Sequence, residues 1–154
     1  MTFRIVQLTD LHVFRDPDTL LKGVAPFRFL EQVIHQLQLL TPQPDALIIT
    51  GDHTHDELPE SYTAVRSLLT PWLDRLWQVP GNHDDRAVLR TVFHDRISGT
   101  ADQLIQFDFE SAGWLCIGLD THVPGAVAGR ISAAQVDQIR SRLQTSSASR
   151  CALF

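Results

Sequence analysis

The sequence predicts a layered α/β fold, and three observations support that prediction. Apolar, strand-like runs alternate with segments of helical periodicity over the first two thirds of the chain, and a different pattern follows. Residues 46–50 form a near-continuous apolar run, which is typical of a strand in a sheet covered on both faces. The chain has 154 residues, 44% of them hydrophobic and 20% charged, so it suits one domain, residues 1–154, with a real core.

Three strands and three helices are expected in the first part of the chain. Pro26 suits the first turn of a helix whose apolar residues recur at helical spacing, and Pro42 lies just beyond its end. Pro59 opens a second helix, which Pro71 interrupts. The expected strands cover residues 3–8, 46–50 and 76–79, and the expected helices cover residues 26–40, 59–69 and 85–93, with Asp85 at the start of the third helix.

The last third of the chain has a different pattern. Residues 103–110 alternate apolar and polar side chains, and a second run at 114–119 follows a short turn, which indicates a β-hairpin. Ser132 and Gln135 have the spacing of a capping box that opens a helix through residue 143. A final apolar run covers residues 151–154.

Charge and composition exclude several classes of partner. The formal net charge of −5 argues against a nucleic acid polymer as partner, although small phosphorylated substrates stay open. No apolar stretch approaches the length of a membrane span, and the first residues lack the features of a signal peptide. Cys116 and Cys151 lie in apolar, strand-like contexts and do not make a disulfide framework, so we expect a reducing, cytoplasmic location without membrane contact.

Polar residues that can carry chemistry follow each of the first three expected strands. The segments are Thr9-Asp10-Leu11-His12, Gly51-Asp52 and Gly81-Asn82-His83-Asp84. Each alone fits an ordinary turn, but a turn would have to be invoked separately three times. Carboxyl ends of neighbouring parallel strands meet at one sheet edge, where ligands bind in open α/β sheets. If the strands are parallel neighbours, five residues converge there: Asp10, His12, Asp52, Asn82 and His83.

These side chains together favour a divalent metal ion. Carboxylate, imidazole and amide oxygen suit manganese, iron or zinc better than calcium, which prefers oxygen ligands throughout. The other histidines have plainer interpretations. We expect His53 and His55 to lie in a solvated loop, from which one could touch the site, and His122 to lie at its rim without binding metal. His35 and His94 are expected to be structural or surface residues.

In their order and position, the three motifs resemble those of the calcineurin-like metallophosphoesterases. The segments Gly118-Leu-Asp-Thr121 and Pro124-Gly125 make the class III cyclic-nucleotide and glycerophosphodiester phosphodiesterases the most similar branch. The resemblance implies an α/β/β/α sandwich, in which two sheets are flanked by helices. It also implies two divalent metal ions, with manganese or iron favoured over zinc, and small phosphodiester substrates.

The resemblance assigns metal ligands residue by residue. Asp10 and His12 would bind one ion, Asp52 would bridge both ions, and Asn82 would bind the second ion and help to place the phosphate. Two cations about 3.5–4 Å apart can convert a water molecule to hydroxide and neutralise charge on the phosphate. The implied reaction is therefore hydrolysis of a small phosphodiester, such as a 3′,5′-cyclic nucleotide or a glycerophosphodiester.

Two further residues receive catalytic roles from the resemblance. His83 would lie over the phosphate or the leaving oxygen and act as the proton donor, so that it both binds substrate and takes part in catalysis. Asp84 would hold the imidazole of His83 in place. Asn82 shares the contact with the substrate.

The sequence departs from the family pattern in its last part. The family continues with a histidine after the next strand and a Gly-His-x-His motif, and neither is present. Without these motifs, the second metal ion would keep only Asp52 and Asn82 as ligands. We therefore expect an N-terminal portion of a longer enzyme, truncated at its C-terminus, with weak activity as given and with an open sheet edge that favours a homo-oligomer. The alternatives are a non-catalytic metal-binding or scaffold module on the same fold, and a nuclease, which the net charge disfavours.

Overall fold

The computed structural model describes residues 2–100 and 102–154. Over these residues the structure has two three-stranded sheets and four α-helices, which confirms the predicted layered α/β class. The strands are β1 (Ile5–Leu8), β2 (Ala46–Thr50), β3 (Leu76–Val79), β4 (Phe107–Ser111), β5 (Trp114–Gly118) and β6 (Arg150–Leu153). The helices are α1 (Pro26–Gln38), α2 (Pro59–Leu69), the 3-10 helix η1 (Thr70–Arg75), α3 (Arg86–Val92) and α4 (Ala133–Thr145).

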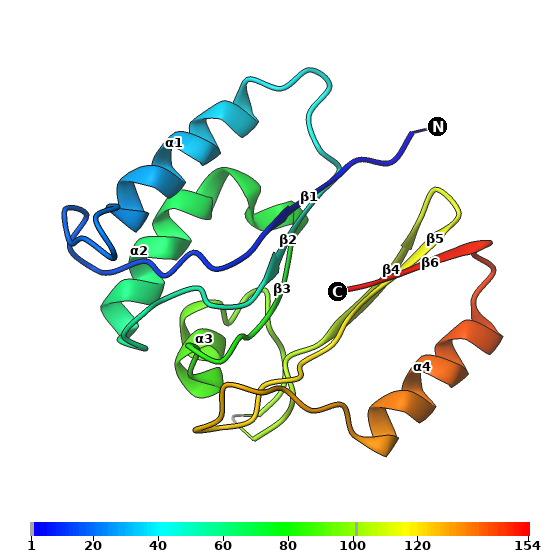
Figure 1. Ribbon diagram of the computed structural model, residues 1–154. Helices are drawn as coiled ribbons and strands as arrows, with labels where there is room; N and C mark the ends of the chain where they lie inside the picture. The colour runs from blue at the N-terminus through cyan, green and yellow to red at the C-terminus, as the bar shows by residue number, and fades with distance from the viewer. Residues whose placement is uncertain (1, 101) are drawn as a thin grey trace.

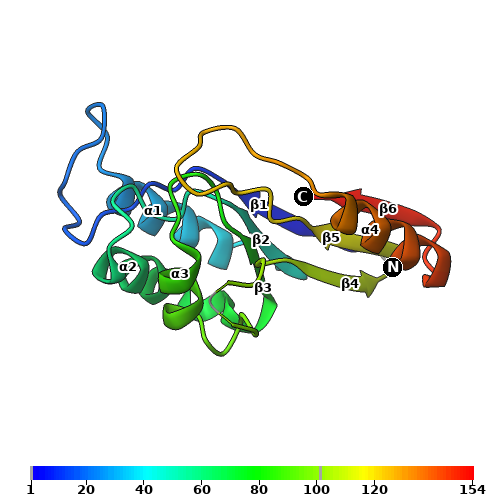
Figure 2. The same ribbon diagram turned by 90° about the horizontal axis from the view of Figure 1, so that it is seen from below.

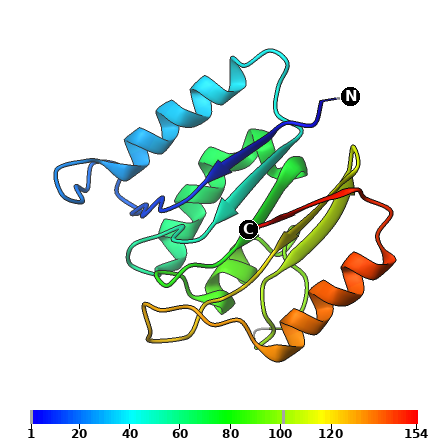
Figure 3. The ribbon, with the colours of Figure 1, turned by 45° about the vertical axis from the view of Figure 1, so that its right-hand side comes forward.

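The first sheet has the order β1-β2-β3, and both pairs of neighbouring strands are parallel. The three motif-bearing strands are therefore parallel neighbours, as the convergence of the motifs required. The central strand β2 is buried from Ala46 to Ile49, in agreement with its continuous apolar sequence. Helices α1, α2 and α3 lie on one side of this sheet (Figure 1). In Figure 3, β1 and β2 point the same way, and the loops that follow them leave at the same edge.

The second sheet has the order β4-β5-β6. Strands β4 and β5 form the predicted antiparallel hairpin, and β6 pairs in parallel with β5 on its other side. Helix α4 lies on the outer side of this sheet, so the layers run helices, sheet, sheet, helix (Figure 1). Figure 2 shows the same arrangement from below.

Aromatic side chains join the two sheets. Trp77 of β3 stacks on Phe109 of β4, with ring centroids 4.6 Å apart, and also contacts Phe107 at 5.4 Å. Phe3, which precedes β1, pairs with Phe109 in a T-shaped arrangement. Large aromatic surfaces packed in this way contribute strongly to burial. They fix the second sheet on the face of the first sheet that α1, α2 and α3 leave free.

Local sequence signals place most element ends correctly. Asp85 caps α3 by accepting a hydrogen bond from the amide of Val88, and Ser132 and Gln135 form the predicted capping box of α4. Several predicted elements were too long: the first strand begins at Ile5, and α1 ends at Gln38, where the chain turns toward Pro42. Within the described residues, no helix combines the length and apolar character needed to cross a membrane.

Candidate active site

The site lies at the carboxyl ends of β1 and β2, where three predicted ligands have an unusual backbone. Asp10, His12 and Asp52 have φ angles of 54°, 44° and 54°, in the left-handed region. Side-chain-bearing residues adopt this region rarely, and such positions concentrate at functional sites when the surrounding structure holds them. The unusual backbone therefore marks the same residues that the motifs marked.

Backbone hydrogen bonds hold these loops side by side. The amide of Asp10 donates to the carbonyl of Gly51 at 3.2 Å, and the amide of His12 donates to the carbonyl of Asp52 at 2.9 Å. A parallel bridge between Val13 and Thr54 continues the contact past the strand ends. The first two motifs are thus tied to each other by main-chain groups, independently of any ligand.

Two glycines allow the second and third motifs to approach closely. A Cβ on Gly51 would lie 2.6 Å from the Cα of Gly81, and a Cβ on Gly81 would lie 2.1 Å from Oδ1 of Asp52. Real Cβ atoms do not tolerate such distances, so these positions need glycine. In return, the amide of His83 reaches Oδ1 of Asp52 and donates a hydrogen bond of 2.9 Å.

Asp10, His12 and Asp52 lie close enough to share one ion. Their donor atoms lie within 4.8 Å of one another. Nε2 of His12 is 3.6 Å from Oδ2 of Asp52 and 4.0 Å from Oδ1 of Asp10, distances too long for direct hydrogen bonds. Asp52 is 7% exposed, and its Oδ2 faces His12 while its Oδ1 is held by the His83 amide. Two carboxylates and one imidazole that approach without bonding one another suit a divalent transition metal.

Asn82 and His83 occupy the neighbouring turn, directly after β3. Asn82 lines a cavity of about 480 Å³ together with His122. The ring of His83 lies 5.0 Å from the ring of His12, between centroids. The structure thus brings Asp10, His12, Asp52 and His83 together and places Asn82 at the adjoining cavity; their binding and catalytic roles stay predictions.

Asp84 does not hold the imidazole of His83, and that prediction is wrong. Its carboxylate instead accepts hydrogen bonds from Nδ1 of His53 at 3.0 Å, from the hydroxyl of Tyr62 at 3.0 Å and from the amide of Gly81 at 2.9 Å. The physical reason is the direction of the side chain, which points into the core, where Asp84 is 2% exposed. Burial raises the pKa of Asp84, but the charge of His53 and these hydrogen bonds outweigh burial and hold the pKa below its usual value.

His53 is also not in the solvated loop that was predicted, because it is completely buried. Its Nδ1 faces Asp84, and its Nε2 lies 3.1 Å from Oε1 of Gln78. In the described part of the chain, the amide nitrogen of Gln78 has no partner. His53 is a structural residue that joins the loop after β2 to β3 and to the turn after β3.

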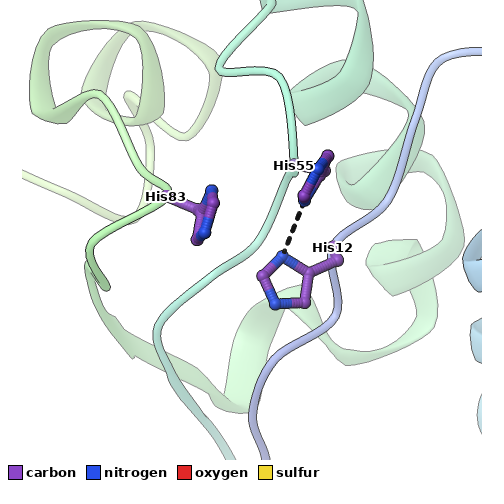
Figure 4. Close-up of side chains that lie close together, drawn as sticks. All are labelled: His12, His55 and His83. Carbon is purple, nitrogen blue, oxygen red and sulfur yellow. Dashed lines mark hydrogen bonds between the residues drawn. The ribbon is translucent and has the colours of Figure 1, made fainter. Parts of the chain in front are cut away.

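His55 belongs to the site, a contact that the sequence analysis left open for one of His53 and His55 without assigning it a role. It was predicted to be solvated, yet it lies half-buried against His12 and His83 (Figure 4). Burial lowers the pKa of His55, and the charges of His12 and His83 lower it further, against the opposite effect of Asp56 and Asp52. The bridge between Val13 and Thr54, which brings His55 to the His12 loop, lies outside the regular strands. The periodicity of the sequence therefore does not predict it.

The fold and the site define a layered α/β protein with carboxylates and imidazoles at the ends of parallel strands. Residues 3–142 match the family model of the calcineurin-like phosphoesterases, and the chain therefore belongs to that family.

Curated relatives carry phosphodiesterase names. The chain is 31% identical over 141 residues to the 3′,5′-cyclic adenosine monophosphate phosphodiesterase CpdA of Pseudomonas aeruginosa, an alignment that covers 92% of this chain and 50% of the relative. It is 32% identical over 148 residues to a cAMP/cGMP dual specificity phosphodiesterase of Mycobacterium tuberculosis, covering 92% and 45%. A 3′,5′-cyclic-nucleotide phosphodiesterase of Nostoc is 29% identical, covering 91% and 51%. The chain spans about half the length of these relatives.

Proposed function

We propose that this protein serves in the metal-dependent hydrolysis of small phosphodiesters, with 3′,5′-cyclic nucleotides as the first candidates and glycerophosphodiesters as the second. The convergence of Asp10, His12 and Asp52 within 4.8 Å at one sheet edge carries the proposal. The phosphodiesterase names of relatives in several bacteria support the substrate class.

The proposed metal ligands are Asp10, His12, Asp52 and Asn82, which would hold two divalent ions. Manganese or iron is favoured because the donors mix carboxylate, imidazole and amide oxygen, and zinc is the alternative. When bound, such ions supply Lewis acidity that activates water and neutralises charge on the phosphate. The uncharged amide of Asn82 adds a ligand without adding negative charge against an anionic substrate.

The residues of the turn after β3 would orient the substrate and move a proton. The amide of His83 fixes Oδ1 of Asp52, so the carboxylate presents Oδ2 toward His12. The imidazole of His83 is the proposed proton donor to the leaving alkoxide. Asp84 contributes indirectly, because its carboxylate binds the Gly81 amide and the buried His53 and thereby holds the turn that carries Asn82 and His83.

The test is hydrolysis of a chromogenic aryl phosphodiester with added manganese, alongside calorimetric titration of the metal. Asp52→Asn and Asn82→Ala are expected to lower turnover at least about 100-fold, since each would remove a ligand or a phosphate contact. His35→Gln in α1 is the matched control and is expected to leave turnover unchanged. Unchanged turnover in both site variants would contradict the proposal.

Metal binding separates this proposal from the alternative of a non-catalytic module on the same fold. Manganese that binds to the chain and is lost in Asp52→Asn, without turnover of aryl phosphodiesters, cyclic nucleotides or glycerophosphodiesters, would favour the module. Turnover with a preference for cAMP over a glycerophosphodiester would instead support the cyclic-nucleotide assignment.

A further inference from the structure

Three imidazoles from three different loops surround one gap in the site. His12 follows β1, His55 follows β2, and His83 follows β3 (Figure 4). Their ring centroids form a nearly equilateral triangle, with sides of 5.3 Å for His12–His55, 5.0 Å for His12–His83 and 5.0 Å for His55–His83. One ring nitrogen from each lies within 4.8 Å of the other two.

The size of this triangle matches three imidazoles around one ion. With zinc–nitrogen bonds of about 2.0–2.1 Å and tetrahedral angles, ligand nitrogens lie about 3.3 Å apart and the ring centroids about 5.2 Å apart. Nδ1 of His12 and Nδ1 of His55 are 3.4 Å apart. That separation is longer than the usual range of a nitrogen-donated hydrogen bond, so it fits a shared cation better than a direct bond.

Within the described residues, each of the three rings also has a nitrogen without a hydrogen-bond partner, in contrast to His53. Both ring nitrogens of His53 have partners, in Asp84 and Gln78. In residues 2–100 and 102–154, the ring of His83 makes no hydrogen bond, and the only polar contact of the His55 ring is its 3.4 Å approach to His12. The rings of His55 and His83 lie nearly parallel, at 19°, so a common ion requires a rotation about χ2 that turns one nitrogen of each ring toward it, and the χ2 angle of histidine has a broad range.

We propose that His55 is a metal ligand and that His12, His55 and His83 form a three-imidazole site for a transition metal ion of the zinc, cobalt or nickel class. Imidazole donors suit these ions, whereas manganese and magnesium are better served by carboxylates. The site overlaps the carboxylate group, because His12 presents Nδ1 toward His55 and Nε2 toward Asp52. This metal binding does not depend on the proposed hydrolysis.

Filling this site has a consequence for the proposed hydrolysis. An ion bound by His83 occupies the imidazole that is the proposed proton donor. Excess zinc would therefore suppress turnover that manganese supports. This consequence alone rests on the proposed function, and the metal site itself is tested without any measurement of activity.

The experiment titrates the intact chain with zinc by calorimetry and with cobalt by visible absorption. His55→Ala is expected to lower zinc affinity at least about tenfold and to weaken the absorption of tetrahedral cobalt, while manganese affinity stays within about twofold. His55→Gln gives the same comparison with a side chain of similar reach, in case alanine disturbs the loop. The matched control is His94→Gln, whose ring is exposed beyond α3, and it is expected to change nothing.

Asp10→Asn distinguishes the new site from the carboxylate group. It is expected to weaken manganese binding and to keep the zinc binding that depends on His55. Unchanged zinc affinity and cobalt absorption in both His55 variants would overturn the proposal. Equal losses of zinc and manganese in those variants would also overturn it, because His55 would then only orient His12. Neither result would bear on whether aryl phosphodiesters are hydrolysed, so the two proposals fail separately.

Discussion

The carboxylate of Asp84 and the imidazole of His53 form a buried pair, with 3.0 Å between Oδ2 and Nδ1. The pair joins the loop after β2 to the turn after β3, and the hydroxyl of Tyr62 and the amide of Gly81 complete the bonds to the carboxylate. Asp84 therefore lies beneath the site, where it fixes the relative position of the two loops that carry Asp52 and His83.

Replacing Asp84 should destabilise the protein. Asp84→Asn removes the charge of a buried, hydrogen-bonded pair, and we expect a loss of about 3 kcal/mol in the free energy of unfolding, measured with urea at pH 7. Asp85→Asn is the matched control, because asparagine caps helices about as well as aspartate and Asp85 caps α3. A loss of similar size in both variants would contradict the structural role of the buried pair.

The same carboxylate should make stability depend on pH. The folded-state pKa of Asp84 lies below its ordinary value of 3.8, so the unfolded chain binds the proton more readily. Its contribution to stability is fully present above the unfolded pKa and is lost as the pH falls through the folded pKa. The difference in unfolding free energy between the wild-type chain and Asp84→Asn should therefore shrink below about pH 4. A difference that grows with acidity would refute the assigned direction.

Gly51 should resist substitution more strongly than a glycine in open space. Gly51 and Gly23 both have positive φ, of 108° and 86°, but only a Cβ on Gly51 meets backbone, at 2.6 Å from Gly81. Gly23→Ala should cost about 1 kcal/mol of backbone strain. Gly51→Ala adds a clash between two strand ends, so we expect a clearly larger loss of stability and weaker manganese binding. Equal thermal unfolding midpoints would show that the two strand ends can separate freely.

Arg86 should tolerate lysine poorly. Its guanidinium donates to both oxygens of the buried Asp120, at 2.6 Å from Nε and 2.7 Å from Nη2, and so joins the start of α3 to the segment after β5. Lysine cannot reproduce this two-bond geometry, and Arg86→Lys should cost about 2 kcal/mol in unfolding free energy.

The control for that substitution is Arg140→Lys on α4. Arg140 pairs with Asp137 at the surface, where both side chains are largely exposed. Exposed pairs contribute little, so we expect a change within about 0.5 kcal/mol. If both lysine variants unfold at the same urea concentration, the Arg86 pair does not join these segments energetically.

The two cysteines should differ sharply in reactivity. Cys116 is buried in β5, and burial raises the pKa of its thiol, whereas Cys151 on the edge strand β6 is exposed. We expect iodoacetamide to modify Cys151 in the native chain and Cys116 only after unfolding, because the thiolate is the reactive form. Mass spectrometry of peptides after timed labelling gives the answer, and native labelling of Cys116 would indicate that β5 opens locally.

Sequence reasoning was most accurate where the signal is local. The strands β2 and β3, the hairpin of β4 and β5, and the caps at Asp85 and Ser132 follow from apolar runs and capping residues a few positions apart. The meeting of Asp10, His12 and Asp52 also followed from the sequence, because parallel neighbours bring their carboxyl ends to one edge.

Only the tertiary structure decided which partners Asp84, His53 and His55 have. Asp84 binds His53 and not the adjacent His83, and His55 joins the site while His53 is buried. These outcomes depend on left-handed backbone at Asp52 and on the bridge between Val13 and Thr54, which redirect the chain where strand alternation has ended. Periodicity describes side-chain direction only inside regular elements. The directions of side chains in the loops are therefore set by contacts between segments that lie far apart in the sequence.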